Sequence, residues 1–325
     1  MLRKYGFLIL MFLGSLFFSC SVADNWYFKE GGSLLWVNRQ LEDSVIKKAV
    51  QNNIENSSII IAQIAWSPGD SSFFENTAWY FSLAKNHGKS FMIAVDWQNT
   101  ERSGVLGNWS FADKDVQELF KKDMLRLLLT YNPDYLNLGV EVNYYALTSP
   151  DGFRAFASLF RELKKELKSS KSGLKVGLSY QLELLYGHHL DWNQSNTFAT
   201  LDNLLGDIDY LGISTYPNMV SNDYQVDILF SSKYIDSISN KYSIPLGISE
   251  TGISSNFYSD EQRLKYVKTI FQKANDLNLK FVIWASMIDS VEDSVWSDKI
   301  GLLTKDGYPK AEFDLWKKGN SNIYN

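Results

Sequence analysis

The chain has 325 residues and a formal net charge of −5 at pH 7, from 32 basic and 37 acidic side chains. Because the two signs of charge are interspersed, the sequence argues against a nucleic-acid partner, whose phosphates a basic surface would have to neutralise. Cys20 is the only cysteine, so we predict neither an intrachain disulfide nor a thiolate site for a metal. The 10 Trp and 18 Tyr suit both a large core and stacking against sugar rings.

The first twenty residues are expected to be a leader rather than part of the fold. Arg3 and Lys4 precede an apolar run, residues 6–18, that is too short to span a bilayer with ordinary flanks. The small residues around Cys20 resemble the lipobox of a bacterial lipoprotein, with Phe17 where Leu is usual. The resemblance implies export, cleavage before Cys20 and a lipid on its thiol that anchors the chain to the cell envelope, at the outer membrane or cell surface. A secretory signal that ends near a cysteine by chance is the alternative, and it also implies export.

The rest of the chain alternates between short β-branched runs and stretches with helical periodicity. We expect strands at residues 33–38, 58–66, 90–97, 135–143, 175–183, 208–216, 244–251 and 280–286. The expected helices cover residues 41–53, 73–87, 113–131, 152–168, 200–205, 231–241, 260–278 and 310–317. Eight such units without a flexible linker predict one α/β domain, a closed (β/α)8 TIM barrel, over residues 33–325 after a short tether at 21–32. An open doubly wound sheet is the alternative, but it normally carries a Gly-rich phosphate turn that this sequence lacks.

Two glutamates stand near the ends of predicted strands, where the active site of such a barrel lies. Glu141 belongs to the fourth predicted strand, and Glu250 belongs to the seventh. Strand alternation predicts that Asn143 shares a face with Glu141 and that Ile248 shares one with Glu250. A buried carboxylate is costly unless it is paired or used, so a structural ion pair is the alternative for either residue alone. Two carboxylates at matching strand ends favour a catalytic pair.

Residues 247–252, Gly-Ile-Ser-Glu-Thr-Gly, are similar to the nucleophile strand of several families in the retaining β-glycosidase clan of (β/α)8 barrels. This clan includes endo-galactanases, mannanases and cellulases, and the resemblance covers nearly the whole mature chain. It implies that Glu250 is the nucleophile and Glu141 the acid/base. It further implies that Tyr216 orients the nucleophile and that Trp284 forms the floor of the sugar subsite.

One position departs from the pattern of the clan. The clan usually has Asn directly before the acid/base, where it binds the sugar 2-hydroxyl, and this chain has Val140. Hydrogen bonds to that hydroxyl strengthen in the transition state. Three interpretations stay open: Asn143 partly replaces the missing Asn, the site handles the 2-position differently, or activity is weak or absent.

Other residues at predicted strand ends are candidates for substrate binding. Asp96 and Trp97 are expected to bind a sugar hydroxyl and ring face, with a loop cap as the alternative. Trp66 is a candidate stacking platform, although a core position is the commoner fate of a Trp. Gln181 is expected to line the site, and Glu183 is a weaker candidate of the same kind.

The loop at residues 98–112, which contains Trp109, is long enough to form one wall of a cleft. His188 and His189 are adjacent and would point apart on a strand, so we interpret them as surface histidines and predict no metal and no cofactor.

The sequence thus predicts a monomeric glycosidase that hydrolyses O-glycosyl bonds of a β-linked poly- or oligosaccharide, galactan- or mannan-like, by endo-acting, retaining double displacement. The membrane is expected as a partner only through the lipid. The alternative is a non-catalytic glycan-binding lipoprotein on the same barrel, since one fold hosts many functions.

Overall fold

The computed structural model describes residues 29–35, 40–192, 196–220, 230–290 and 299–321. The predicted leader with Cys20 and most of the predicted tether lie outside the described residues, as do the last residues of the first expected strand. Among the described residues, no helix has the length and apolar character needed to cross a membrane.

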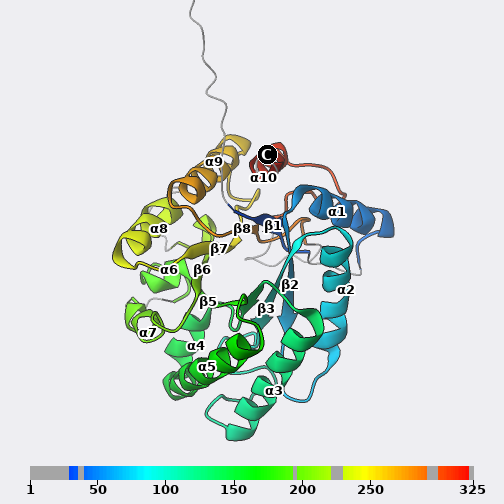
Figure 1. Cartoon of the computed structure of the whole chain (residues 1–325). Coiled ribbons are helices and arrows are strands. Elements are labelled where there is room, and N and C mark those ends of the chain that lie inside the picture. Colours follow the sequence, from blue (N-terminus) through cyan, green and yellow to red (C-terminus); the bar gives the residue numbers. More distant parts are fainter. Residues whose placement is uncertain (1–28, 36–39, 193–195, 221–229, 291–298, 322–325) are drawn as a thin grey trace, which may run out of the picture.

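Eight parallel strands form one sheet in the order β1-β8-β7-β6-β5-β4-β3-β2. The pairing of β1 with β8 brings the first and last strands together, so the sheet forms a nearly closed barrel with helices around it (Figure 1). The strands are β1 (Gly31–Ser33), β2 (Ile59–Ala65), β3 (Ser90–Asp96), β4 (Tyr135–Asn137), β5 (Lys175–Gln181), β6 (Tyr210–Thr215), β7 (Leu246–Thr251) and β8 (Val282–Trp284). The predicted single (β/α)8 barrel is confirmed.

The helices follow the strands in the alternating order that the sequence predicts. They are α1 (Asp43–Asn56), α2 (Ser72–Asn86), α3 (Lys114–Tyr131), α4 (Val142–Thr148), α5 (Pro150–Ser170), α6 (Leu182–Leu185), α7 (Phe198–Asp202), α8 (Phe230–Lys241), α9 (Asp260–Asp276) and α10 (Phe313–Ser321), with a 3₁₀ turn at Pro217–Met219. Local sequence fixes several boundaries: Ser259 and Gln262 form a capping box at the start of α9, and Asn132 ends α3 in a left-handed conformation. The short helices α4 and α6, which directly follow β4 and β5, were not predicted.

The alternation of side chains along each strand separates two apolar layers. The larger layer lies between the sheet and the helices and includes Ile60, Ile93 and Ile213. A smaller cluster fills the barrel interior and includes Ile61 and Ala94. Along each strand, every second side chain points into the barrel. Those that lie beyond this cluster, toward the carboxyl ends of the strands, form what we call the mouth of the barrel.

Candidate active site

Glu250 reaches the barrel mouth because β7 is irregular. Ile213 of β6 pairs with Ile248, but the next residue, Ser214, pairs with Glu250, so one residue of β7 is skipped. Ile248 faces the helices, and regular alternation would turn Glu250 the same way. The shift in register instead places Glu250 opposite Ser214 on the interior parity, as bulges beside active sites do. The prediction that Ile248 and Glu250 share a face is therefore wrong, and the bulge is the reason.

Glu141 is presented by a sharp turn rather than by a strand. β4 ends at Asn137 and α4 begins at Val142, so the prediction that this strand runs to residue 143 is wrong. Glu141 itself has φ 49° and ψ 47°, the left-handed region that a residue with a side chain rarely adopts. Such a conformation costs about 1–3 kcal/mol and persists only where neighbours hold it.

Neighbouring elements hold that turn through its backbone. The Glu141 N–H donates to Ser179 Oγ at 3.0 Å. Gln98 Nε2 donates to the carbonyl of Val140 at 2.6 Å and to that of Glu141 at 3.2 Å. The orientation of Glu141 thus depends on β5 and on the segment after β3, which are distant from it in sequence.

Tyr216 and Glu250 are in direct contact. The Tyr216 hydroxyl donates to Oε2 of Glu250 at 2.8 Å, and both residues are buried. Glu183 supports Tyr216 from behind, because its Oε1 accepts from the Tyr216 N–H at 3.0 Å and from Thr215 Oγ1 at 2.6 Å. Glu183 is fully buried, and its two hydrogen bonds hold the end of β6 in place.

Asp96, Arg102 and Glu141 form a chain of charges at the mouth. Arg102 Nη1 lies 3.0 Å from Oδ1 of Asp96, and Nη2 lies 3.4 Å from Oε2 of Glu141. Burial raises the pKa of Asp96, and the adjacent guanidinium partly offsets that effect. Asp96 thus shares Arg102 with Glu141, and Arg102 was not among the predicted residues. The predicted contact of Asp96 with a sugar hydroxyl stays a prediction.

The two glutamates have raised pKa values. Burial raises the pKa of Glu141, while the charge of Arg102 acts in the opposite direction. Burial and the negative charge of Glu141 raise the pKa of Glu250 to about 8, and the hydrogen bond from Tyr216 opposes them. Because like charges disfavour double ionisation, the pair is expected to hold one proton at neutral pH.

The predicted aromatic platforms do not lie in this mouth. Trp66, Trp97 and Trp284 are fully buried in the layer between sheet and helices. The indole N–H of Trp284 donates to the carbonyl of Ile300 at 2.7 Å, and its ring packs against Trp316 of α10 with centroids 5.8 Å apart. The structure therefore corrects the prediction of sugar stacking, because strand parity turns all three rings toward the helices.

The indole N–H groups of Trp66 and Trp97 also have hydrogen-bond acceptors within the protein. The Trp66 N–H donates to Asp123 of α3 at 2.9 Å, and the Trp97 N–H donates to the carbonyl of Leu138 at 2.9 Å. By contrast, Trp109 in the loop after β3 is 45% exposed. Trp109 is therefore the exposed aromatic residue of the loop that we predict to form one wall of a cleft.

The Asn143 side chain binds the main chain of Gln181, whereas the Gln181 side chain lies on the interior side of β5 and has a hydrogen bond with Tyr144. Both amide atoms of Asn143 bond the main chain of Gln181 at 2.9 Å. The Gln181 side chain accepts from the N–H of Leu182 at 3.0 Å and contacts Met219 Sδ at 2.9 Å. Because Asn143 lies in α4 and is fully buried, the prediction that it extends the strand face of Glu141 is wrong. The predicted contact of Gln181 with substrate stays a prediction.

Tyr144 and His189 form a further buried contact beside Glu141. The Tyr144 hydroxyl and His189 Nε2 lie 2.8 Å apart, and Arg102 lies over the Tyr144 ring. Burial lowers the pKa of His189 to about 4, so it is neutral near pH 7. The interpretation of His189 as a surface residue is wrong.

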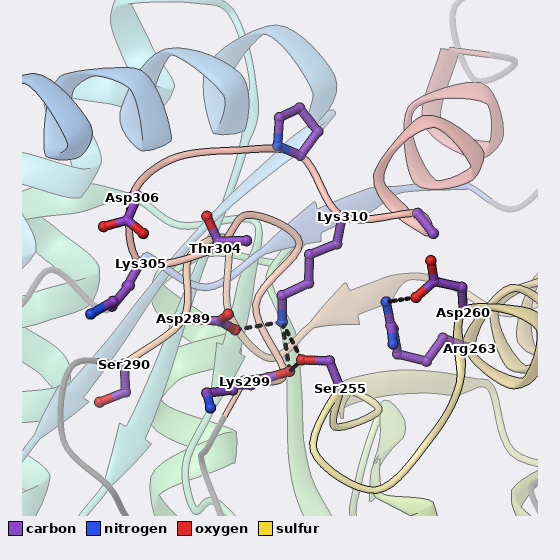
Figure 2. Close-up of a pocket in the computed structure, with 12 residues that line it drawn as sticks. Ser255, Asp260, Arg263, Asp289, Ser290, Lys299, Thr304, Lys305, Asp306 and Lys310 are labelled. Atoms are coloured by element: carbon purple, nitrogen blue, oxygen red, sulfur yellow. Dashed lines mark hydrogen bonds and ion pairs between the residues drawn. The ribbon is translucent and has the colours of Figure 1, made fainter.

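A separate cavity of about 520 Å³ lies between the segments that follow β7 and β8. Figure 2 shows Lys310 at its centre, directed toward Asp289, Ser255 and the carbonyl of Lys299. Its buried groups are paired with one another, so it is distinct in chemistry from the carboxylate-rich mouth.

A scan against protein-family models found no match, and neither did a search of curated proteins. Solved structures, in contrast, share the fold. β-Glycosidase BGL167 has a TM-score of 0.60 at 14% identity, covering 87% of this chain and 86% of that one. The β-glycosidase from the hyperthermophile Thermosphaera aggregans has a TM-score of 0.63 at 12% identity, covering 85% of each chain. The exo-β-1,4-mannosidase Op5Man5 from Opitutaceae bacterium strain TAV5 has a TM-score of 0.66 at 12% identity, covering 92% of this chain and 61% of that one.

These similarities confirm the (β/α)8 barrel fold that the sequence predicts. At 12–14% identity they concern the fold.

Proposed function

We propose that this protein is a glycoside hydrolase that cleaves a β-linked poly- or oligosaccharide with retention of configuration. The observation that carries the proposal is the contact of Tyr216 with Glu250, in a buried cluster that also contains Glu141. The hydrogen bond from Tyr216 favours the ionised form of Glu250, which favours placing the proton that the pair holds on Glu141. A galactan- or mannan-like polymer, cleaved internally, is the substrate we favour.

In the first step of the proposed mechanism, a carboxylate oxygen of Glu250 attacks the anomeric carbon. The bond to the leaving oxygen breaks as the carboxyl of Glu141 donates its proton to that oxygen, which leaves a covalent glycosyl ester on Glu250. In the second step, ionised Glu141 takes a proton from water, and the resulting attack at the anomeric carbon releases Glu250. Both residues return to their initial protonation states.

Reducing-end release from soluble galactan, mannan, xylan and mixed-linkage glucan tests the proposal. Wild-type release that is abolished in Glu250→Gln supports a hydrolase and identifies its substrate class. Glu118→Gln, at an exposed position of α3, is the matched control and should retain wild-type activity. Proton NMR of the first product anomer decides between retention and inversion, and an inverted product would contradict the double displacement.

A second candidate function is non-catalytic glycan binding, and Val140 favours it. This apolar residue belongs to the interior cluster and precedes Glu141, where the resembling clan has Asn. Affinity electrophoresis on the same glycans separates the candidates. Binding without turnover in wild type, unchanged by Glu250→Gln, would favour the binder.

We also propose that the chain is exported and carries a lipid on Cys20, as the leader indicates. Metabolic labelling with an alkyne fatty acid should modify the wild type and leave Cys20→Ser unlabelled. Labelling of both forms, or of neither, would contradict lipid attachment at this cysteine.

A further inference from the structure

Arg102 lies in the segment between β3 and α3, and several contacts hold its charge in place. Nη1 lies 3.0 and 3.3 Å from the carboxylate oxygens of Asp96, and Nη2 lies 3.4 Å from Oε2 of Glu141. The backbone has a left-handed φ of 55°, and its carbonyl accepts from Thr148 Oγ1 at 2.7 Å. The guanidinium also lies 5.7 Å from the centroid of Tyr144. A fixed positive charge is therefore held against the proposed acid/base.

This charge opposes the role of Glu141. A general acid must be protonated when substrate binds, whereas a nearby guanidinium favours the ionised carboxylate. Tyr216 acts on the other member of the pair, because its O–H donates to Glu250 and favours ionised Glu250. Arg102 also acts on Glu250 at longer range, but Glu141 is the member of the pair that it contacts, whereas Tyr216 contacts Glu250.

Other charged and titratable groups around Glu141 also affect its protonation. The charged or titratable residues that act on it or respond to its charge are Asp96 on β3, Arg102 after it, Tyr144 on α4, Glu183 on α6, Tyr216 on β6 and Glu250 on β7. The ionised carboxylates of this set repel a negative charge on Glu141, and the guanidinium stabilises it. Asp96 shares that guanidinium, which reduces its effect on Glu141.

Building on the glycosidase mechanism above, we propose that Arg102 is a positioning residue whose charge sets the alkaline limit of activity by stabilising the ionised, inactive form of Glu141. In the active form, Glu250 is ionised and Glu141 protonated. Raising the pH removes that last proton, and the cation makes its removal easier. Loss of the charge at position 102 should extend activity to higher pH, and loss of the charge of Asp96 should do the reverse.

The test is the pH dependence of kcat/KM on the glycan that wild type hydrolyses. Arg102→Met should move the alkaline limb upward by about one pH unit, the low end of the effect of a charge at this distance. Arg102→Lys should keep the limb near its wild-type position, and Asp96→Asn should move it downward. Arg154→Met removes an exposed cation of α5 and should leave the limb in place.

A direct titration covers variants that fold but turn over slowly. Circular dichroism establishes folding, and ¹³C NMR of labelled glutamate carboxyls, assigned with Glu141→Gln, follows the titration of Glu141. An unmoved limb together with an unmoved Glu141 titration in Arg102→Met overturns the proposal. Absence of wild-type turnover on every glycan counts against the proposed hydrolase instead, and the NMR titration still decides the role of Arg102.

Discussion

Two clusters of side chains that follow the carboxyl ends of the strands pair cations with carboxylates, and they differ in the number of carboxylates that share each cation. In the cavity after β7 and β8, Lys310 Nζ donates to Asp289 at 2.7 Å, to Ser255 Oγ at 3.2 Å and to the carbonyl of Lys299 at 2.6 Å (Figure 2). These contacts match the three N–H donors of an ammonium. Asp289 also accepts from the N–H of Gly301 at 2.8 Å. Lys310 thus has one carboxylate partner here, and each of its three N–H donors has an acceptor.

At the barrel mouth the balance is different. Arg102 contacts both Asp96 and Glu141, and Glu250 adds a further carboxyl. The side chains of Arg102 and Asp96 are 27% and 22% exposed, whereas those of Lys310 and Asp289 are each 6% exposed. The unbalanced, accessible cluster is suited to proton transfer, and the balanced, closed one to stability. Functional sites are where such departures from local stability are expected.

The largest expected effect is on activity, at Glu250. Glu250→Gln should lower kcat by about 10⁴-fold or more, as loss of a nucleophile does. Its free energy of unfolding should be unchanged or higher, because a buried carboxyl with a raised pKa is replaced by a neutral group. Initial rates and urea unfolding measure the two quantities. A marked loss of stability would mean that Glu250 is a structural residue, and it would contradict the distinction between the mouth and the Lys310–Asp289 cluster.

Variants of the Lys310–Asp289 pair should lose stability, which Glu250→Gln is expected to keep. Lys310→Met leaves Asp289 buried without its cation and should lower the free energy of unfolding by about 3–5 kcal/mol. The double variant Lys310→Met/Asp289→Leu should recover much of that loss, because no unpaired charge remains. Urea unfolding of both variants checks this. Full stability in Lys310→Met alone would show that the pair does not hold these segments.

Tyr216→Phe should have a smaller effect, confined to the mouth. A hydrogen bond to a charged group contributes about 1.5–3 kcal/mol, which corresponds to about 1–2 pH units in the pKa of its acceptor. Because this bond favours ionised Glu250, its loss raises the pKa of Glu250, and the acid limb of the activity profile should move upward. A pH profile in which the acid limb stays in place would remove Tyr216 from the proposed mechanism.

A separate expected effect, on stability alone, is the pH dependence of the free energy of unfolding due to Glu183. Burial raises its pKa to about 8 from an ordinary 4.5, so the native protein binds this proton more tightly than the unfolded chain. This contribution is present below about pH 4.5 and is lost as the pH rises toward about 8. Glu183→Gln keeps an acceptor for Tyr216 and should reduce the fall in Tm over that window. An equally steep fall in the variant would assign it to other groups.

Much of the site was predictable because the relevant signals are local. Glu141, Glu250, Tyr216 and Asp96 each end an apolar run, and parallel strands bring such ends together. The structure places all four at the mouth. Arg102 was missed because a single Arg in a long polar loop carries no periodic signal. The length of that loop was the available indication.

The sequence by itself determined the eight strand–helix units and the two strand ends that carry glutamates, because apolar periodicity is written into short segments. Tertiary structure decided which way each side chain points. The bulge of β7 depends on its register against β6, and the left-handed turn at Glu141 depends on Ser179 and Gln98 from other elements. Strand parity, fixed by packing of the closed sheet, turned Trp284 toward the helices. A change of one residue in register reverses the face of every side chain that follows, so these orientations become definite when the barrel closes.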